Sequence, residues 1–181
     1  MSWQNATFFV PGTLALRRNT RHCSRMLEVG VRVPRVSAKT TQERLVDLTD
    51  FFGQHLVVYF FPKAFTPGCT AETKKFRDNY SEIKALGAEV IGISMDAHAT
   101  QCRFAAETGA KFPMIADAGG EITAAFGVKW SLIPFAKRVT FIIDPHGTIV
   151  ARFHHELQVL KHLDQVLKFI QTAAKEKSEK P

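Results

Sequence analysis

A cysteine at the start of an expected helix is the residue of this chain best suited to chemistry. Cys69 lies in the run PKAFTPGCTAE, directly after the apolar stretch 56–61. Thr66 offers a hydroxyl for the helix N-cap and Pro67 suits the first helical position, so Cys69 falls in the first turn. Backbone N–H groups and the positive end of the helix dipole favour a thiolate there. The sequence therefore predicts cysteine chemistry.

A thiolate at this helix start also needs a cation. A helix terminus stabilises a neighbouring negative charge by only about 0.3–2 kcal/mol, and a hydrogen bond from the Thr66 hydroxyl would add about 1.5–3 kcal/mol. An arginine is the more dependable partner, because it stays protonated and offers several donors in a fixed fork. Arg138 is the leading candidate, since it precedes the apolar strand expected at 139–143, which the predicted fold places beside the strand 56–61.

The spacing of these residues forms a recognisable pattern. Pro62, Thr66 and Cys69 read PxxxTxxC, and the pattern continues with Glu72 and with KRVTFIIDPHG, which contains Arg138. The chain resembles the peroxiredoxins over about residues 27–172, specifically the bacterioferritin comigratory protein or peroxiredoxin Q branch. The resemblance implies a thiol-dependent peroxidase that acts on hydrogen peroxide and organic hydroperoxides. It also implies regeneration by thioredoxin or a similar thiol donor, in antioxidant defence.

The same resemblance implies a role for each residue of the pattern. Cys69 would attack the peroxide O–O bond and become a sulfenic acid. Thr66 and Arg138 would hold the peroxide oxygens, Pro62 would shield the pocket, and Glu72 would orient Arg138. Preorganised donors of this kind suit displacement at oxygen, because negative charge develops on the leaving oxygen. No cofactor is implied.

The second, resolving cysteine is where the chain departs from the branch. Many members carry it five positions after the first cysteine, and here that position is Lys74. Another group carries it on a later helix, near the segment 97–108, which contains Cys102. Cys102 lies about one helical turn before the expected position, Ala105, and residues three apart share a helical face. A Cys69–Cys102 disulfide and a one-cysteine cycle both stay open.

Composition fits one compact domain. The chain has 181 residues, 45% of them hydrophobic, and no apolar stretch long enough to span a bilayer, which predicts a soluble protein. Three cysteines, with Cys23 far from the other two, are not a secreted disulfide scaffold and favour a reducing compartment. We expect a monomer, with a dimer as the alternative.

Most of the net charge of +7 lies outside the expected domain. Residues 1–27 hold four arginines and no acid, whereas residues 28–173 hold 17 basic and 15 acidic residues. The near-neutral domain has no basic stripe with interleaved aromatics, so we expect no nucleic-acid and no membrane binding. Residues 1–26 read as a disordered extension or a transit-like segment, residues 27–173 as the domain and residues 174–181 as a charged tail. A cytoplasmic location is expected, with a plastid or mitochondrion as the alternative.

Strand and helix patterns alternate along the domain. They predict a thioredoxin-like α/β fold, with a central mixed β-sheet covered by helices on both faces. The Asp144–Gly147 turn predicts a hairpin. Strands are expected at 45–48, 56–61, 88–94, 113–116, 139–143 and 148–153, a turn at 50–53, and helices at 67–86, 97–108, 119–126 and 156–172.

Other functions lack their motifs. Thioredoxin-type chemistry needs CxxC, and a cysteine phosphatase needs an arginine where this chain has Lys75. The alternative that stays open is a non-catalytic redox sensor or binding protein on the same fold.

His98 and Cys102 share a helical face at ligand-like spacing, but no second pair completes a tetrahedral set, so no metal is expected. The apolar loop 130–135 reads as core or pocket wall, with an interaction patch as the alternative.

Overall fold

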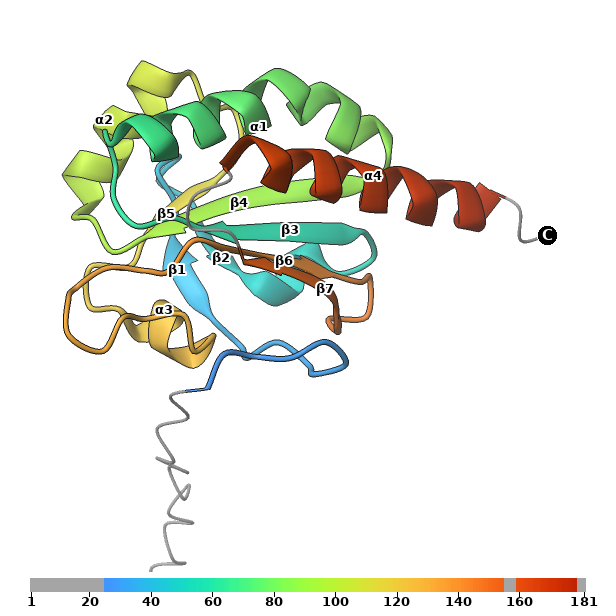
Figure 1. Cartoon of the computed structure of the whole chain (residues 1–181), viewed down its shortest axis with the longest axis horizontal. Coiled ribbons are helices and arrows are strands. Elements are labelled where there is room, and N and C mark those ends of the chain that lie inside the picture. The colour runs from blue at the N-terminus through green and yellow to red at the C-terminus, as the bar shows by residue number, and fades with distance from the viewer. Residues whose placement is uncertain (1–24, 155–158, 179–181) are drawn as a thin grey trace, which may run out of the picture.

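A five-stranded mixed sheet forms the centre of the molecule (Figure 1). The computed structural model describes residues 25–154 and 159–178. The strand order is β5-β4-β3-β6-β7, with β3, β4 and β5 parallel and β6 and β7 antiparallel to their neighbours. The elements are, in chain order, β1 (Ser37–Lys39), β2 (Leu45–Asp47), the 3-10 helix η1 (Leu48–Phe51), β3 (His55–Phe60), α1 (Pro67–Ala85), β4 (Ala88–Ser94), α2 (His98–Thr108), β5 (Met114–Ala116), α3 (Glu121–Ala125), β6 (Val139–Ile143), β7 (Ile149–His154) and α4 (Val159–Ser178).

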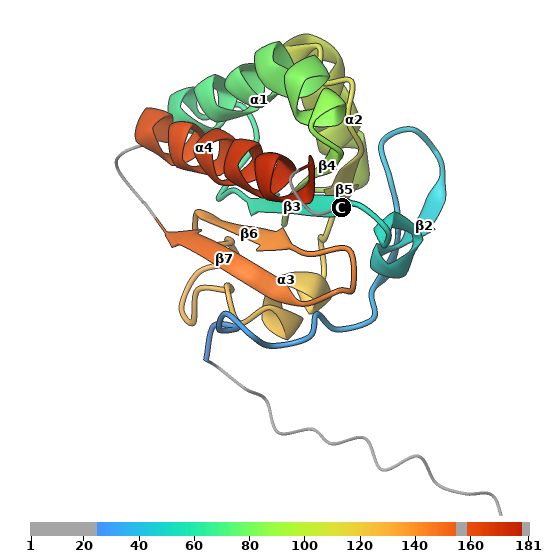
Figure 2. The ribbon, with the colours of Figure 1, turned by 90° about the vertical axis from the view of Figure 1, so that its right-hand side faces the viewer.

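The sheet separates two apolar clusters. Figure 2 shows α1, α2 and α4 over one face and α3 against the other. Alternate residues of β3 point to opposite faces, so Val57 and Tyr59 join the cluster under the long helices, whereas Val58 and Phe60 join the cluster on the α3 side. This burial on both faces explains the continuous apolar run of β3 and confirms the predicted thioredoxin-like layers.

The central strand pairing agrees with the prediction from sequence. β6 lies antiparallel to β3, and the expected hairpin joins β6 to β7, with the Asp144 amide donating to the Thr148 carbonyl at 2.8 Å. The helix expected at 67–86 is α1, and its buried residues include Cys69, Phe76 and Ile83. The side chain of Cys69 therefore faces the core, as its spacing from Phe76 predicts.

Two features near the N-terminus were not predicted. β1 pairs with β2 in a separate small hairpin, and its three residues carry no apolar run that would mark a strand. The turn expected at 50–53 is confirmed at residues 52 and 53, whereas residues 50 and 51 belong to η1, which begins at Leu48 and was not predicted. Asp47 and Asp50 form a capping box that satisfies the first amides of η1, a signal that the sequence contained.

The last helix extends beyond its predicted end at Thr172. α4 ends at Ser178, because Ala, Lys and Glu are strong helix formers that continue the helix after the apolar stripe stops. The predicted start of this helix falls in residues 155–158, outside the described residues, as do residues 1–24 and 179–181. No helix within the described ranges is both long enough and apolar enough to cross a membrane.

Candidate active site

The register of β3 and β6 brings the two ends of the sequence pattern together. Phe60, the last residue of β3, pairs with Val139, the first residue of β6. The loop from β3 to α1 therefore begins at the same end of the sheet as Arg138, which directly precedes β6. In an antiparallel pair the end of one strand lies beside the start of the other, so residues far apart in sequence become neighbours at that end of the sheet.

Cys69, Arg138 and Glu72 form a buried contact chain. Arg138 Nη2 donates to Cys69 Sγ at 3.2 Å, and Arg138 Nη1 donates to Glu72 Oε2 in an ion pair. Cys69 is 1%, Glu72 2% and Arg138 5% exposed. Glu72 lies one turn after Cys69 on the same face of α1, so one helix supplies both groups to the arginine.

The arginine keeps its charge in this buried place. Burial opposes the charge, but the carboxylate of Glu72 and the sulfur of Cys69 outweigh that effect and raise the pKa of Arg138. The guanidinium thus places a fixed cation against the Cys69 sulfur. Arg138 Nε has no hydrogen-bond partner among the described residues, so the guanidinium retains one further donor.

The loop before α1 is held from two sides. The Ala64 amide donates to Asp96 Oδ2 at 2.8 Å, which ties the loop to the carboxyl end of the neighbouring strand β4. Phe65 adopts a left-handed backbone with φ of 65°, and its ring packs edge-on against Phe104 of α2 at 5.2 Å. We did not predict the role of Asp96, although a polar residue directly after a parallel strand commonly faces the same edge as a site.

Thr66 occupies the N-cap position of α1, but its side chain does not cap the helix. Its Oγ1 donates to the Lys63 carbonyl at 3.0 Å instead, and no side-chain cap hydrogen bond forms. The prediction of a Thr66 hydroxyl capping α1 is therefore wrong, because the turn at Ala64 and Phe65 folds the Lys63 carbonyl back toward it. The first-turn amides of α1 are left without this internal acceptor. Pro62 is half-buried in the same loop.

A tyrosine that we did not single out from the sequence lies in the core cluster that contains Cys69. Tyr59 is fully buried, and its hydroxyl shares a 3.2 Å hydrogen bond with Thr73 Oγ1. Burial raises the pKa of Tyr59 well above its ordinary value, so the phenol stays neutral. Its ring stacks on Phe76 at 4.5 Å, and Gly92 makes room for it, since a Cβ there would come within 2.6 Å of the hydroxyl. The stacked rings of Tyr59 and Phe76 therefore pack α1 against β3.

Cys102 does not join the buried contact chain. It is a half-buried free thiol on α2, and its Sγ lies 3.4 Å from His98 Nε2. The Cys69 sulfur instead contacts Arg138. The two free cysteines therefore have separate surroundings, although α1 and α2 pack together.

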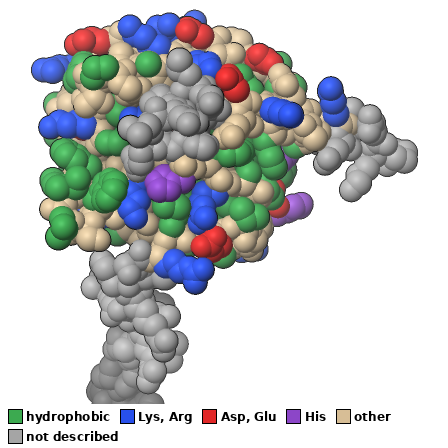
Figure 3. Space-filling model, viewed as in Figure 1, with side chains coloured by type: hydrophobic (Ala, Val, Ile, Leu, Met, Phe, Trp, Pro, Cys, Tyr) green, Lys and Arg blue, Asp and Glu red, His purple; other side chains and the backbone are tan. Residues whose placement is uncertain are grey.

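The apolar loop between α3 and β6 is a surface feature. Leu132 is 96% exposed, with Trp130 and Ile133 also exposed, so the prediction of a core or pocket-wall loop is wrong in its first part, and the pocket-wall reading stays a prediction. Figure 3 shows hydrophobic side chains gathered at the left of the molecule, where Figure 1 draws this loop. One end borders the site, since Lys63 Nζ lies 5.4 Å from the centre of the Phe135 ring.

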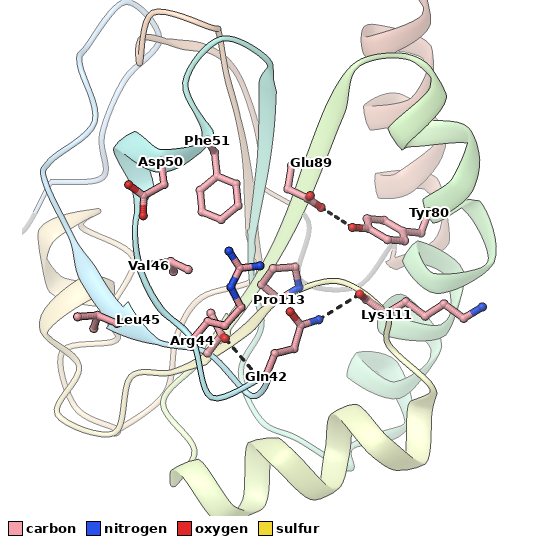
Figure 4. A pocket seen from close by; sticks show the side chains of 11 residues that line it. Gln42, Arg44, Leu45, Val46, Asp50, Phe51, Tyr80, Glu89, Lys111 and Pro113 are labelled. Atoms are coloured by element: carbon pink, nitrogen blue, oxygen red, sulfur yellow. Dashed lines mark hydrogen bonds between the residues drawn. The ribbon is translucent and has the colours of Figure 1, made fainter.

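A pocket of about 220 Å³ lies elsewhere, between the β1–β2 hairpin and the α1 side of the sheet (Figure 4). Its polar lining includes Arg44, Tyr80, Glu89 and Lys111, and none of its lining residues belongs to the sequence pattern around Cys69. Two of these lining side chains already bond each other, since the Tyr80 hydroxyl donates to Glu89 Oε1. The chemistry predicted from sequence therefore does not lie in this pocket.

Comparison with known proteins agrees with the geometry. The model of the AhpC/TSA family matches residues 29–152. Peroxiredoxin Q, chloroplastic, of Gentiana triflora is 38% identical over 141 residues, which are 77% of this chain and 65% of that protein. The protein of the same name from Sedum lineare is 32% identical over 173 residues, 95% of this chain and 92% of that one.

Solved structures show the same fold. Peroxidoxin BcpB of Mycobacterium tuberculosis matches with a TM-score of 0.75 and 30% identity, over 82% of this chain and 98% of that one. The bacterioferritin comigratory protein of Xanthomonas campestris, described with its alkyl peroxide reduction activity, matches with a TM-score of 0.72 and 28% identity, over 77% and 92% of the two chains.

Proposed function

The chain belongs to the AhpC/TSA family and is a peroxiredoxin, a thiol peroxidase, and we propose that Cys69 is its peroxidatic cysteine. Its substrates are a peroxide and a thiol reductant. The proposal rests on one observation above all: Arg138 Nη2 lies 3.2 Å from Cys69 Sγ, while Glu72 holds the other end of the same guanidinium. Three charged or ionisable side chains are seldom buried together unless they work as a unit.

In the proposed reaction the Cys69 thiolate attacks one peroxide oxygen. An S–O bond forms and the O–O bond breaks, so sulfur is oxidised to a sulfenic acid and the peroxide is reduced. The leaving oxygen takes up a proton and departs as water or an alcohol. Arg138 stabilises the charge that moves onto this oxygen, and its unpaired Nε is a donor that the site can offer.

The remaining residues of the pattern position the reaction. Glu72 orients Arg138 and, because it is itself buried, fixes the plane of the guanidinium. Thr66 holds the peroxide through its hydroxyl once substrate competes with the Lys63 carbonyl. Pro62 shields the thiolate from water on the loop side. These are proposals for hydrogen peroxide and organic hydroperoxides alike.

A thioredoxin-coupled assay tests the function. We expect the full chain to consume hydrogen peroxide and an alkyl hydroperoxide in the presence of thioredoxin, thioredoxin reductase and NADPH. Turnover with dithiothreitol but not with thioredoxin would support peroxidase activity and reject thioredoxin as the electron donor. No peroxide loss with either reductant would instead favour a non-catalytic sensor on the same fold.

We propose that Cys102 resolves the sulfenic acid, with a one-cysteine cycle as the alternative. The Cys102 thiol attacks the Cys69 sulfur, a disulfide forms and water leaves. A disulfide needs the two Cα atoms within about 4.4–6.8 Å. Cys69 faces the core and Cys102 faces His98, so the first turn of α1 has to unwind locally before the bond can form.

Peptide mass mapping after one equivalent of peroxide separates the two cycles. We expect a Cys69–Cys102 crosslink in wild type and a persistent Cys69 sulfenic acid in Cys102→Ser. Cys23→Ser is the matched control and should keep the crosslink. A sulfenic acid or an external thiol adduct that is the same in wild type and Cys102→Ser would establish the one-cysteine route.

We also propose a monomer in the cytoplasm. A dimer and an organelle are the alternatives, and the chloroplastic names of the plant relatives are the reason to test the organelle directly. Sedimentation of the full chain distinguishes a monomer from a dimer. Imaging of a reporter fused behind residues 1–26 tests the location, since uniform cytoplasmic signal rejects a targeting role for that segment.

A further inference from the structure

A second group of chemistry-bearing side chains lies between α2 and the β1–β2 hairpin. Glu43, His98 and Cys102 each offer one ligand atom, and these atoms all lie within 4.8 Å of one another. His98 Nε2 is 2.9 Å from Glu43 Oε1 and 3.4 Å from Cys102 Sγ. Sequence alone revealed only the His98–Cys102 pair, because the third ligand comes from the β1–β2 hairpin.

The fold holds the hairpin and α2 in this relation. The Thr41 amide donates to the Met114 carbonyl at 2.8 Å, and Gln42 Nε2 donates to the Lys111 carbonyl at 3.2 Å, as Figure 4 shows for Gln42. On α2, buried Gln101 bonds Ser94 Oγ at 3.0 Å and the Ile115 carbonyl at 3.3 Å. These bonds set the rotation of α2, so His98 and Cys102, one turn apart, face the hairpin.

The carboxylate is also prepared for the site. Glu43 has a left-handed backbone with φ of 60°, at a turn position that favours glycine, and its Oε1 lies 2.9 Å from His98 Nε2 of α2. Its second oxygen pairs with Lys39.

One detail distinguishes a metal site from a proton relay. In a relay through imidazole, the carboxylate contacts one ring nitrogen and the thiol contacts the other. Here both contacts are made by Nε2 of His98, which carries at most one proton. A cation bound between the three residues satisfies all three ligand atoms at once. The bond lengths of tetrahedral zinc place its ligand atoms about 3.3–3.7 Å apart. The 3.4 Å between His98 Nε2 and Cys102 Sγ lies in this range, whereas the 2.9 Å between His98 Nε2 and Glu43 Oε1 is shorter and has to widen when the ion binds.

We propose that Glu43, His98 and Cys102 bind one Zn²⁺ ion, with a water molecule as the fourth ligand. The mixed thiolate, imidazole and carboxylate set suits this borderline-soft cation. Binding displaces the thiol proton of Cys102 and joins the hairpin to α2. The site shares Cys102 with the proposed resolving step, so a bound Zn²⁺ ion would withhold this thiol from the Cys69 sulfenic acid. Metal binding itself is read out without peroxidase activity.

Cobalt is the probe, because a thiolate-bound Co²⁺ ion absorbs through ligand-to-metal charge transfer. We expect one equivalent of Co²⁺ to give this band in the reduced full chain, and Zn²⁺ to remove it. Cys102→Ser should abolish the band, and Cys69→Ser and Cys23→Ser should keep it. His98→Ala and Glu43→Gln should weaken Zn²⁺ binding in chelator competition by at least about tenfold.

Matched controls remove a histidine or a glutamate elsewhere on the surface. His146→Ala and Glu121→Gln, both exposed, should leave Zn²⁺ affinity unchanged. Glu43→Gln lies on an exposed hairpin, so it tests the proposal even where another variant fails to fold. No stoichiometric cobalt band in wild type, or a band that survives Cys102→Ser, would overturn the site. A band lost only in Cys69→Ser would place the metal at Cys69.

Discussion

Replacing Cys69 by serine should reduce peroxide turnover at least about 10³-fold. The serine hydroxyl is not ionised at neutral pH and cannot form the sulfenic acid, so the first chemical step is lost. The substitution exchanges one small side chain for another in a site where Arg138 can still donate a hydrogen bond. The fold should therefore persist, which thermal unfolding followed by circular dichroism checks.

The thioredoxin-coupled assay measures this loss, with Cys102→Ser as the matched control. That variant removes a cysteine outside the buried contact chain and should retain the first burst of peroxide consumption, even where later turnovers slow. Turnover in Cys69→Ser within about tenfold of wild type would reject Cys69 as the peroxidatic residue.

Arg138→Lys should lower the rate of peroxide reduction by about 10²–10³-fold, although the charge is unchanged. An ammonium is a compact point charge and cannot donate to Cys69 and Glu72 in one fixed plane while offering a further donor to the substrate. Most of the loss should therefore appear in the rate of sulfenic acid formation, measured by rapid mixing with peroxide.

Two companion variants separate geometry from general damage. Arg152→Lys changes an arginine that pairs with Glu28 on the surface and should react at the wild-type rate. Glu72→Gln keeps Arg138 but removes the carboxylate that orients it, and a loss smaller than that of Arg138→Lys is expected. A normal rate in Arg138→Lys would show that a different cation serves the sulfur.

The parts of the fold visible in the sequence are those with strong local signals. The apolar run before Pro62, the Thr66-Pro67 helix start and the turn before Thr148 predicted β3, α1 and the β6–β7 hairpin. The neighbourhood of Arg138 and Cys69 followed from placing β6 beside β3. β1 was missed because a short polar strand leaves no periodic trace.

The details of the site depend on contacts that local patterns do not encode. Thr66 has the expected position, yet its hydroxyl bonds Lys63, because the loop conformation decides which acceptor is nearest. Asp96, which follows β4, accepts a hydrogen bond from the Ala64 amide in the loop between β3 and α1. Glu43 meets His98 only because the hairpin bonds to the segment after α2, a pairing between residues 55 positions apart. Such contacts follow from tertiary structure alone.

The enclosure of Cys69 has a consequence for survival under excess peroxide. Cys69 is 1% exposed in the first turn of α1, so the sulfenic acid of the proposed reaction would stay in place until that turn opens. During this delay a second peroxide molecule can oxidise it to the sulfinic acid, which is irreversible without a dedicated repair enzyme. With Cys69 as the proposed peroxidatic residue, we expect the opening rate of this helical turn to set the peroxide concentration at which the enzyme inactivates itself.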